Sequence, residues 1–399
     1  MDDLFRFHEN LLSQVSDKFI RGLYYNLDWN NRMVGVKGPR GSGKTTLLLQ
    51  YIKYRLKPRK GEALYASLDH YWFYKNLLVE LVDNFYTNGG KYLFLDEVHK
   101  YPNWSRELKN IYDAYPDLKV VFTASSALDI YRGEADLSRR VITYELSGMS
   151  FREYLKFNSI LDFEKISLEE IVNNHYEISK LITKDLKILP HFKDYLRRGY
   201  FPYFKESNEA DYHIKLTKTI NAVLESDLAF VNNHSPQTAF KIKKFLGVLA
   251  ESAPFKPNIA ELARKLDVSR DMIYDWFSLL ENARLLNLIN IKKKGDSFLQ
   301  KPDKVYLENT NMAYAFLSNP DVGNIREAFL MSQLINAKFS LTLPLNGDFK
   351  INDNYIFEVG GKKKSFNQIK NIENSFIAAD EIEIGYMNKI PLWLFGFLY

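Results

Sequence analysis

The stretch Gly38-Pro39-Arg40-Gly41-Ser42-Gly43-Lys44-Thr45 decides the fold of the first part of this chain. It fits the pattern G-x-x-x-x-G-K-[ST], a glycine-rich loop whose backbone N–H groups cradle the phosphates of a nucleoside triphosphate. The apolar residues 33–36 before the loop predict a buried strand, and residues 46–56 after it predict a helix. Because the motif requires a strand before it and a helix after it, we expect a nucleotide-binding α/β domain here.

The residues of this loop have distinct predicted roles. Lys44 is expected to reach the β- and γ-phosphates and so to take part in catalysis, and the Thr45 hydroxyl is expected to ligate Mg²⁺. ATP and Mg²⁺ are therefore the expected cofactors. The residues expected to bind the nucleotide are Gly38, Pro39, Arg40, Gly41, Ser42, Gly43, Lys44, Thr45 and Thr46.

A second motif, Lys91-Tyr92-Leu93-Phe94-Leu95-Asp96-Glu97, places two acids at the end of an apolar run. In a parallel sheet this strand would deliver a carboxylate to the edge where the phosphate loop lies. We expect Asp96 to hold the metal, mostly through water, and Glu97 to orient and deprotonate the attacking water. The alternative is a strand that ends in two solvated acids.

Two later groups are further candidates for the site. Residues 118–126 predict a strand ending in hydroxyl side chains, of which Ser125 is expected to contact the nucleotide; a helix N-cap is the alternative. Arg140 precedes a predicted strand at 141–146 and could stabilise transition-state charge on the nucleotide of a neighbouring subunit. A plain surface arginine is the alternative. Strands alternating with helices up to residue 146 predict a mostly parallel, right-handed sheet.

Composition sets broad limits on the class of protein. The chain has 399 residues, 46% of them hydrophobic and 26% charged, and a formal net charge of +5, which permits an acidic partner without demanding one. It has no cysteine, so disulfides and thiolate metal sites are excluded. The N-terminus lacks the features of a signal peptide, and no apolar run is long enough to span a membrane. We therefore expect a cytoplasmic protein without a membrane partner.

Beyond residue 150 the pattern changes. The expected domains are a P-loop ATPase domain at 1–150, a helical lid or bridging region at 151–235, a winged-helix-like domain at 236–300 and a nuclease-like α+β domain at 301–399. Residues 259–280 have helix-turn-helix spacing, which would place Lys265, Ser269, Arg270 and Tyr274 near DNA. The acids Asp271 and Asp275 oppose contact with phosphates, so a protein-contact or internal packing domain is the alternative.

Acids and a lysine in the last hundred residues form a nuclease-like constellation. Glu327, Asp348 and Glu358 could bind Mg²⁺, and Lys362 could stabilise a pentavalent phosphate. Glu358 and Lys362 are four positions apart, whereas the usual spacing is acid-x-Lys. The alternative, which we favour, is an exposed strand with solvated charges or a degenerate site.

The chain resembles the bacterial and archaeal AAA-type ATPases in which a domain of unknown function follows the motor domain. The resemblance rests on the phosphate loop, Phe94-Leu95-Asp96-Glu97-Val98-His99 with Trp104, the segment 147–154 and the segment 357–362. It implies an AAA-plus-like core with sheet order 5-1-4-3-2, then a winged-helix segment and a C-terminal nuclease-like fold. It also maps the family arginine onto Arg140, and gives a residue at the tip of strand four the role called sensor 1.

The leading functional hypothesis is a Mg²⁺-dependent ATPase that couples ATP binding and hydrolysis to a macromolecular partner held by its C-terminal half. One alternative is an ATP-regulated DNA-binding protein without significant turnover, and another is an ATPase-linked nuclease. DNA or a protein could bind through the winged-helix and C-terminal domains. A homo-oligomer is compatible with the predicted role of Arg140.

Overall fold

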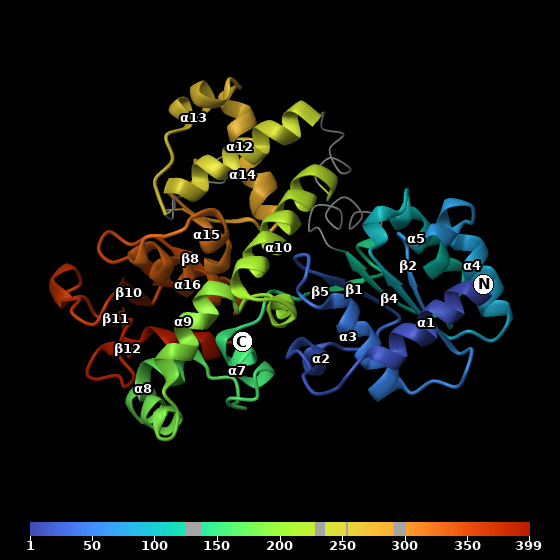
Figure 1. Cartoon of the computed structure of the whole chain (residues 1–399), viewed down its shortest axis with the longest axis horizontal. Helices are drawn as coiled ribbons and strands as arrows, with labels where there is room; N and C mark the ends of the chain where they lie inside the picture. The colour runs from blue at the N-terminus through green and yellow to red at the C-terminus, as the bar shows by residue number, and fades with distance from the viewer. Residues whose placement is uncertain (125–136, 228–235, 253, 291–300) are drawn as a thin grey trace. The chain divides into compact units, whose positions relative to one another are not determined.

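The computed structural model describes residues 1–124, 137–227, 236–252, 254–290 and 301–399 (Figure 1). The chain divides into two compact units, an N-terminal unit, Met1–Gly148, and a C-terminal unit, Met149–Tyr399. Among the described residues, no helix is both long and apolar enough to cross a membrane. The expected division of residues 151–399 into three domains stays a prediction.

The N-terminal unit is built on a five-stranded sheet in which every pair of neighbouring strands is parallel. The strand order is β2-β3-β4-β1-β5, which confirms the order 5-1-4-3-2 that the family resemblance implied. Parallel strands bring all their carboxyl ends to one edge of the sheet, and the phosphate loop follows β1 at that edge. The strands are β1 (Met33–Lys37), β2 (Ala63–Ser67), β3 (Tyr92–Asp96), β4 (Lys119–Ala124) and β5 (Ile142–Glu145).

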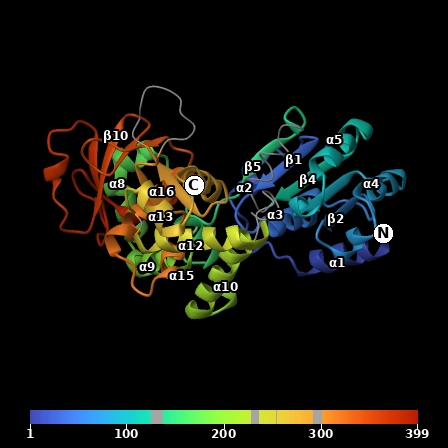
Figure 2. The same ribbon diagram turned by 90° about the horizontal axis from the view of Figure 1, so that it is seen from above.

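Strands β1 to β4 are buried on both faces, which explains why they read as continuous apolar runs, whereas the edge strand β5 is partly exposed. Successive side chains point to opposite faces: Leu93 and Leu95 enter one core cluster, and Phe94 between them enters the other. Figures 1 and 2 show the strands of this unit lying between its helices. The helices are α1 (Asp2–Gln14), α2 (Leu23–Asn26), α3 (Lys44–Gln50), α4 (Leu78–Thr87) and α5 (Trp104–Ala114).

The apolar periodicity of residues 71–86 predicts one continuous helix, and this prediction is wrong in one respect, because the structure interrupts it. Tyr71–Tyr74 form a short 3₁₀ turn, and α4 begins only at Leu78. The Glu80 carboxylate accepts a hydrogen bond from the Leu77 backbone N–H at 3.2 Å, which caps a new helix start. The helix after the phosphate loop also changes character, since Tyr51–Leu56 continue α3 as a π-helical turn.

The first part of the C-terminal unit is helical, as expected. It contains α7 (Phe151–Phe157), α8 (Leu168–Thr183), α9 (Ile188–Arg198), α10 (Glu209–Ala222) and α12 (Pro236–Ser252). Ser150 begins α7 with a capping box, in which its hydroxyl accepts from the Glu153 N–H and the Glu153 carboxylate accepts from the Ser150 N–H.

Two helices and a hairpin follow. They are α13 (Ile259–Leu266), α14 (Arg270–Asn282), β6 (Leu286–Ile289) and β7 (Lys304–Leu307), with β6 and β7 antiparallel. The Ser269 hydroxyl caps α14 by accepting from the Met272 N–H at 3.2 Å. Arg270, Asp271 and Asp275 are exposed on this helix, so its solvent face carries more acid than base.

The last part of the chain forms a second five-stranded sheet, in the order β12-β11-β10-β9-β8. β10, β11 and β12 are parallel, whereas β9 runs antiparallel to β10 and to β8. The elements are α15 (Thr310–Phe316), α16 (Val322–Asn336), β8 (Leu341–Thr342), β9 (Phe349–Ile351), β10 (Tyr355–Gly360), β11 (Ser375–Ala379) and β12 (Lys389–Pro391). The expected fold class, a P-loop α/β unit followed by helical and sheet-containing parts, is therefore confirmed.

Candidate nucleotide-binding site

The phosphate loop has the backbone geometry that its glycines allow. Gly41 and Gly43 have φ angles of 81° and 97°, in the left-handed region that other residues rarely adopt. Gly38 faces a different constraint, because a Cβ atom on it would lie 2.2 Å from the Leu146 carbonyl oxygen. Two glycines therefore allow the turns of the loop, and the third allows its close approach to the chain that follows β5.

Lys44 turns back over the loop from the first position of α3. Its ammonium nitrogen donates to the carbonyl oxygens of Gly38, at 2.9 Å, and Pro39, at 3.1 Å. The side chain is buried, so the charge lies within the curve of the loop rather than in solvent. The loop residues Pro39 and Ser42 are also buried, whereas Gly41 and Thr46 are exposed and Arg40 is half-buried. Within the described residues, the buried Ser42 hydroxyl has no hydrogen-bond partner.

Asp96 lies at the end of β3 and is the centre of a cluster of hydroxyl groups. Its carboxylate accepts hydrogen bonds from Thr45 at 2.6 Å, from Tyr65 at 2.7 Å and from Thr123. Asp96 is only 2% exposed, so these donors satisfy a carboxylate that has left water. Burial, together with the Asp96 charge, raises the pKa of Tyr65 far above its usual range, so Tyr65 stays a donor. Thr45 and Asp96, the two predicted metal ligands, are thus in direct contact.

Glu97 follows Asp96 with a φ angle of 54°, a left-handed conformation that is unfavourable for its side chain. Its backbone N–H donates to the Thr123 hydroxyl at 3.1 Å, which holds this turn against β4. One Glu97 carboxylate oxygen lies 3.5 Å from Nε2 of His99, a side chain that is 1% exposed. The structure therefore places His99, which belongs to the same motif, beside the predicted base.

Three residues of this site were not predicted as site residues. Thr123 belongs to the segment 118–126, in which the sequence predicted Ser125 as the nucleotide contact. Ser125 lies outside the described residues. Tyr65 reaches Asp96 because β2 pairs with β3, and Arg21 contacts the loop from the chain between α1 and α2. The register of β2 on β3 could not be inferred from sequence. No motif around Arg21 pointed to it.

Arg140 lies away from the phosphate loop of its own chain. It precedes β5, at the amino end of the parallel strands, whereas the loop follows the carboxyl end of β1. Its guanidinium donates to both carboxylate oxygens of Asp113, each at 2.9 Å, and this bond lowers the pKa of Asp113. Arg140 is therefore placed where it cannot contact its own nucleotide, and a role in hydrolysis would require a second subunit.

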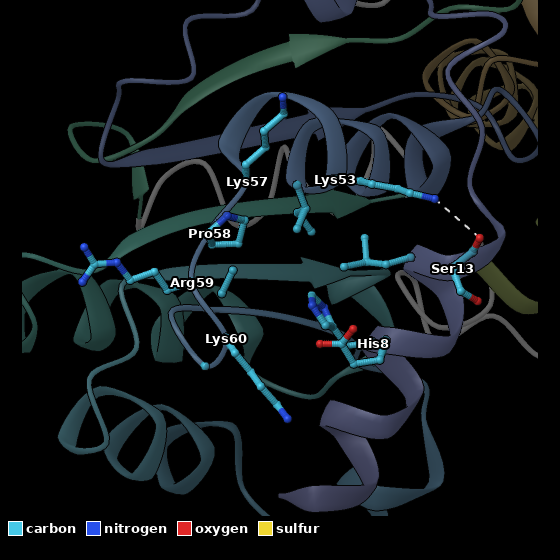
Figure 3. A pocket seen from close by; sticks show the side chains of 12 residues that line it. His8, Ser13, Lys53, Lys57, Pro58, Arg59 and Lys60 are labelled. Atoms are coloured by element: carbon cyan, nitrogen blue, oxygen red, sulfur yellow. Dashed lines mark hydrogen bonds between the residues drawn. The ribbon is translucent and has the colours of Figure 1, made fainter.

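A cavity of about 700 Å³ lies between α1 and the residues that lead into the amino end of β2. Figure 3 shows Lys57, Arg59 and Lys60 leaving the loop 57–61 in different directions, with His8 on helix α1 beside this loop. The His8 ring accepts a hydrogen bond from the Tyr65 N–H at 3.0 Å, and burial lowers the pKa of His8. None of the predicted site residues lines this cavity, so it is not the phosphate site.

In the C-terminal unit, the acids of the nuclease-like constellation are each bound to a protein group. Glu327 pairs with Lys304 at 2.5 Å, and the Asp348 carboxylate accepts from the Val359 N–H at 2.8 Å. Glu358 pairs with Lys364 at 2.5 Å, whereas Lys362 is exposed. The lysine that contacts Glu358 is thus Lys364, and not Lys362, which the sequence had proposed as the phosphate-stabilising lysine of this site. Among the described residues, no group of three or more His, Asp or Glu side chains is arranged to hold a metal ion.

Two separate segments of the chain match the models of known protein families. Residues 30–155 match the model of a family described as an AAA domain, and residues 189–322 match a family described as a domain of unknown function. Uncharacterized protein MJ1637 of Methanocaldococcus jannaschii is 28% identical to this chain, over 98% of this chain and 89% of that protein.

Solved structures that resemble the chain do so distantly. The Walker-type ATPase PABY2304 of Pyrococcus abyssi has a TM-score of 0.40 and 10% identity, covering 72% of this chain and 91% of its own. AMPPCP-bound DnaA of Aquifex aeolicus has a TM-score of 0.28 and 16% identity, over 66% and 90%. At these scores the likeness carries no conclusion about activity. The family match and the geometry of the loop agree: residues 30–155 are an AAA-type P-loop domain.

Proposed function

We propose that this protein is a Mg²⁺-dependent ATPase, which binds ATP on the loop 38–46 and hydrolyses it with Glu97 as the general base. The observation that carries the proposal is the contact between the Thr45 hydroxyl and the Asp96 carboxylate, at 2.6 Å. It joins the helix that follows the phosphate loop to the acidic end of β3, which are the two parts that hold the metal in P-loop enzymes.

The residues present fit Mg²⁺ and a triphosphate. Mg²⁺ prefers oxygen ligands and is usually held by one or two carboxylates together with substrate phosphates and water, rather than by a cage of protein groups. Thr45 and Asp96 supply such oxygens side by side. The Lys44 ammonium lies inside the loop on two carbonyl oxygens, from which a short movement would carry it to phosphate oxygens.

Glu97 is the group we assign to proton transfer. Its carboxylate is 19% exposed, so water can reach it, and its backbone is fixed to Thr123. In this role Glu97 orients a water molecule and accepts its proton, while Lys44 stabilises charge on the phosphates. We assign the bound Mg²⁺ the task of neutralising phosphate charge. Ser125 remains a proposed nucleotide contact.

For Arg140 we propose a role between subunits of a homo-oligomer. It would leave the Asp113 carboxylate and stabilise transition-state charge on the nucleotide of a neighbouring subunit. Asp113 is half-exposed, so this ion pair lies at the surface and costs little to open.

The C-terminal unit contributes none of the groups named above, and we propose that it holds the macromolecular partner on which ATP hydrolysis acts. The exposed acids Asp271 and Asp275 on α14 would repel the phosphates of DNA. We therefore favour a protein partner over DNA for this helix.

The proposal is tested by ATP turnover and nucleotide affinity of purified variants. Lys44→Ala should lose nucleotide binding. Glu97→Gln should bind ATP with the affinity of the wild type but hydrolyse it at least about 100-fold more slowly, because general-base catalysis contributes factors of this order. Arg59→Gln is the control and should change neither quantity, because Arg59 precedes the amino end of β2, whereas the phosphate loop follows the carboxyl end of β1. Wild-type turnover by Glu97→Gln would exclude Glu97 as the base.

A further inference from the structure

Arg21 is a buried arginine whose hydrogen bonds join two separate stretches of chain. One guanidinium nitrogen donates to the Ser42 carbonyl oxygen at 2.6 Å, and another donates to the carbonyl oxygens of Ser147 at 2.8 Å and Gly148 at 3.0 Å. The residue is only 6% exposed. A guanidinium suits this position because its fork of donors can reach several acceptors at once, which an ammonium on a flexible stem cannot do as well.

The bond to Ser42 controls the orientation of a group inside the phosphate loop. The Ser42 carbonyl and the Gly43 N–H belong to one planar peptide group, so they point in opposite directions. When Arg21 holds the carbonyl on the outer side of the loop, the Gly43 N–H is directed to the inner side. Backbone N–H groups on the inner side are the ones that cradle phosphates in such loops.

The beginning of the phosphate loop packs against residues 146–148, the segment that contains two of the carbonyl groups bound by Arg21. A Cβ on Gly38 would lie 2.2 Å from the Leu146 carbonyl oxygen, and the Leu146 N–H donates to the Lys37 carbonyl oxygen at 2.8 Å. The phosphate loop is therefore attached to residues 146–148 at two points, directly beside Gly38 and through Arg21 at Ser42.

Residues 146–148 are the last residues of the N-terminal unit. The next residue, Met149, is anchored in the C-terminal unit, where its N–H donates to the Tyr200 carbonyl oxygen at 2.7 Å and its carbonyl accepts from the Tyr195 hydroxyl at 2.8 Å. The chain thus passes from groups attached to the phosphate loop to groups attached to the C-terminal unit across one peptide bond, Gly148–Met149.

We propose that Arg21 is a positioning residue that couples occupancy of the phosphate loop to the junction at Gly148–Met149. A phosphate that draws in the Gly43 N–H turns the shared peptide group, moves the Ser42 carbonyl, and so changes the pull of Arg21 on Ser147 and Gly148. The inference rests on the proposed function, because it requires a nucleotide on the loop. It assigns to Arg21 the step by which nucleotide state reaches the C-terminal unit.

The test combines nucleotide affinity with hydrogen exchange, measured by mass spectrometry on the full chain with and without saturating Mg-ATP. In the wild type, ATP should slow exchange both in the loop, residues 38–47, and at the junction, residues 146–149. In Arg21→Met we expect affinity to fall about tenfold, the usual effect of losing hydrogen bonds from a charged donor. At saturating ATP this variant should keep protection of the loop but lose it at the junction.

Arg32→Met is the matched control. Arg32 also donates to backbone carbonyls of the N-terminal unit, those of Tyr112 and Tyr115, but it precedes β1 at the opposite edge of the sheet. It should lower the melting temperature and leave both protection signals intact. If Arg21→Met does not fold, Arg21→Lys keeps the charge without the three-way contact and allows the same comparison.

The outcomes separate the coupling from the proposed function. If ATP does not protect the loop in the wild type, the proposed nucleotide binding fails. If the wild-type loop is protected but the junction is not, or if the Arg21 variant keeps full junction protection, the coupling through Arg21 is wrong while the ATPase assignment stands.

Discussion

At the scale of single residues, the Thr123 hydroxyl links the two acids of the site. It donates to the Asp96 carboxylate and accepts from the Glu97 N–H. Thr123→Val keeps the shape of the side chain but leaves both groups without this partner. We expect ATP turnover to fall at least about tenfold, because an unsatisfied buried polar group costs on the order of 1–3 kcal/mol. Steady-state kinetics should show the loss in kcat rather than KM.

Thr143→Val is the control for this variant, since Thr143 lies on β5, two strands away from β4. It should retain wild-type kcat. An equal loss of kcat in both variants would mean that threonine packing in the sheet, and not the shared hydroxyl, supports turnover.

Asp348 gives a prediction about pH and stability. Burial, with Glu327 and Glu358 nearby, raises the pKa of Asp348 to about 6. An unfolded aspartate has a pKa of about 3.9, so between these two values the folded state binds more protons and stability falls as pH rises. Asp348→Asn removes the charge and should therefore stabilise the C-terminal unit at pH 7, by about 1–3 kcal/mol.

Urea denaturation of this variant and the wild type at pH 4 and pH 7 checks the sign. The advantage of Asp348→Asn should be present at pH 7 and much smaller at pH 4, where Asp348 is protonated in the folded state and about half protonated in the unfolded state. Asp185→Asn, at an exposed position, should show no such change. A variant that is less stable than wild type at pH 7 would contradict the raised pKa.

The candidate site could be predicted from sequence only where chemistry is written into a local motif. Lys44 and Thr45 lie within one loop, and Asp96 follows a single apolar run; the structure brings these three together. Tyr65 and Arg21 come from other parts of the chain, and they join the site through strand pairing and loop packing. The spacing of residues along the chain does not indicate such contacts, so neither residue could be identified as part of the site without the structure.

At the scale of elements, the phosphate loop and the chain after β5 are packed with no room for a side chain at Gly38. Gly38→Ala would place a methyl group 2.2 Å from the Leu146 carbonyl oxygen, so the backbone at one of these two residues would have to shift. Gly61 is the comparison position, because its φ angle of 85° is also unfavourable for alanine but nothing lies within 4 Å of a Cβ there. Gly61→Ala should cost about 1–2 kcal/mol of strain alone.

We expect Gly38→Ala to lower the melting temperature of the N-terminal unit more than Gly61→Ala does, and to abolish nucleotide binding. Differential scanning fluorimetry with and without Mg-ATP measures both effects. If Gly38→Ala kept an ATP-dependent rise in melting temperature, the loop would be able to function away from Leu146.

Elements with a strong local pattern were the ones predicted well. Strands β1 to β4 follow from apolar runs that are buried on both faces, and Leu93, Phe94 and Leu95 show why: alternate side chains enter different cores. The break before α4 was missed, since residues 71–86 are apolar-periodic throughout. It depends on the Glu80 carboxylate binding the Leu77 N–H, a cap that is unusual for leucine.

At the scale of the whole molecule, contacts between distant parts of the sequence hold the C-terminal unit together. The Ser150 hydroxyl donates to the Tyr399 carbonyl oxygen at 2.8 Å, and the Ile166 N–H donates to the Phe397 carbonyl oxygen at 3.0 Å. The first part of this unit is therefore bound to its last residues. The sequence shows how composition changes from segment to segment, but it does not show which distant segments contact each other.

The division into two units predicts how nucleotide acts on stability. A ligand that binds only the folded N-terminal unit stabilises it by about 2.7 kcal/mol at a hundred times its dissociation constant. Calorimetry of the full chain should then show two transitions, of which Mg-ATP moves one upward by roughly 5–10 °C. Lys44→Ala should abolish that shift and leave the other transition in place. The contrary outcome is a single transition that Mg-ATP moves as a whole. It would mean that the two units unfold together, coupled through the Gly148–Met149 junction, next to which Arg21 binds Ser147 and Gly148.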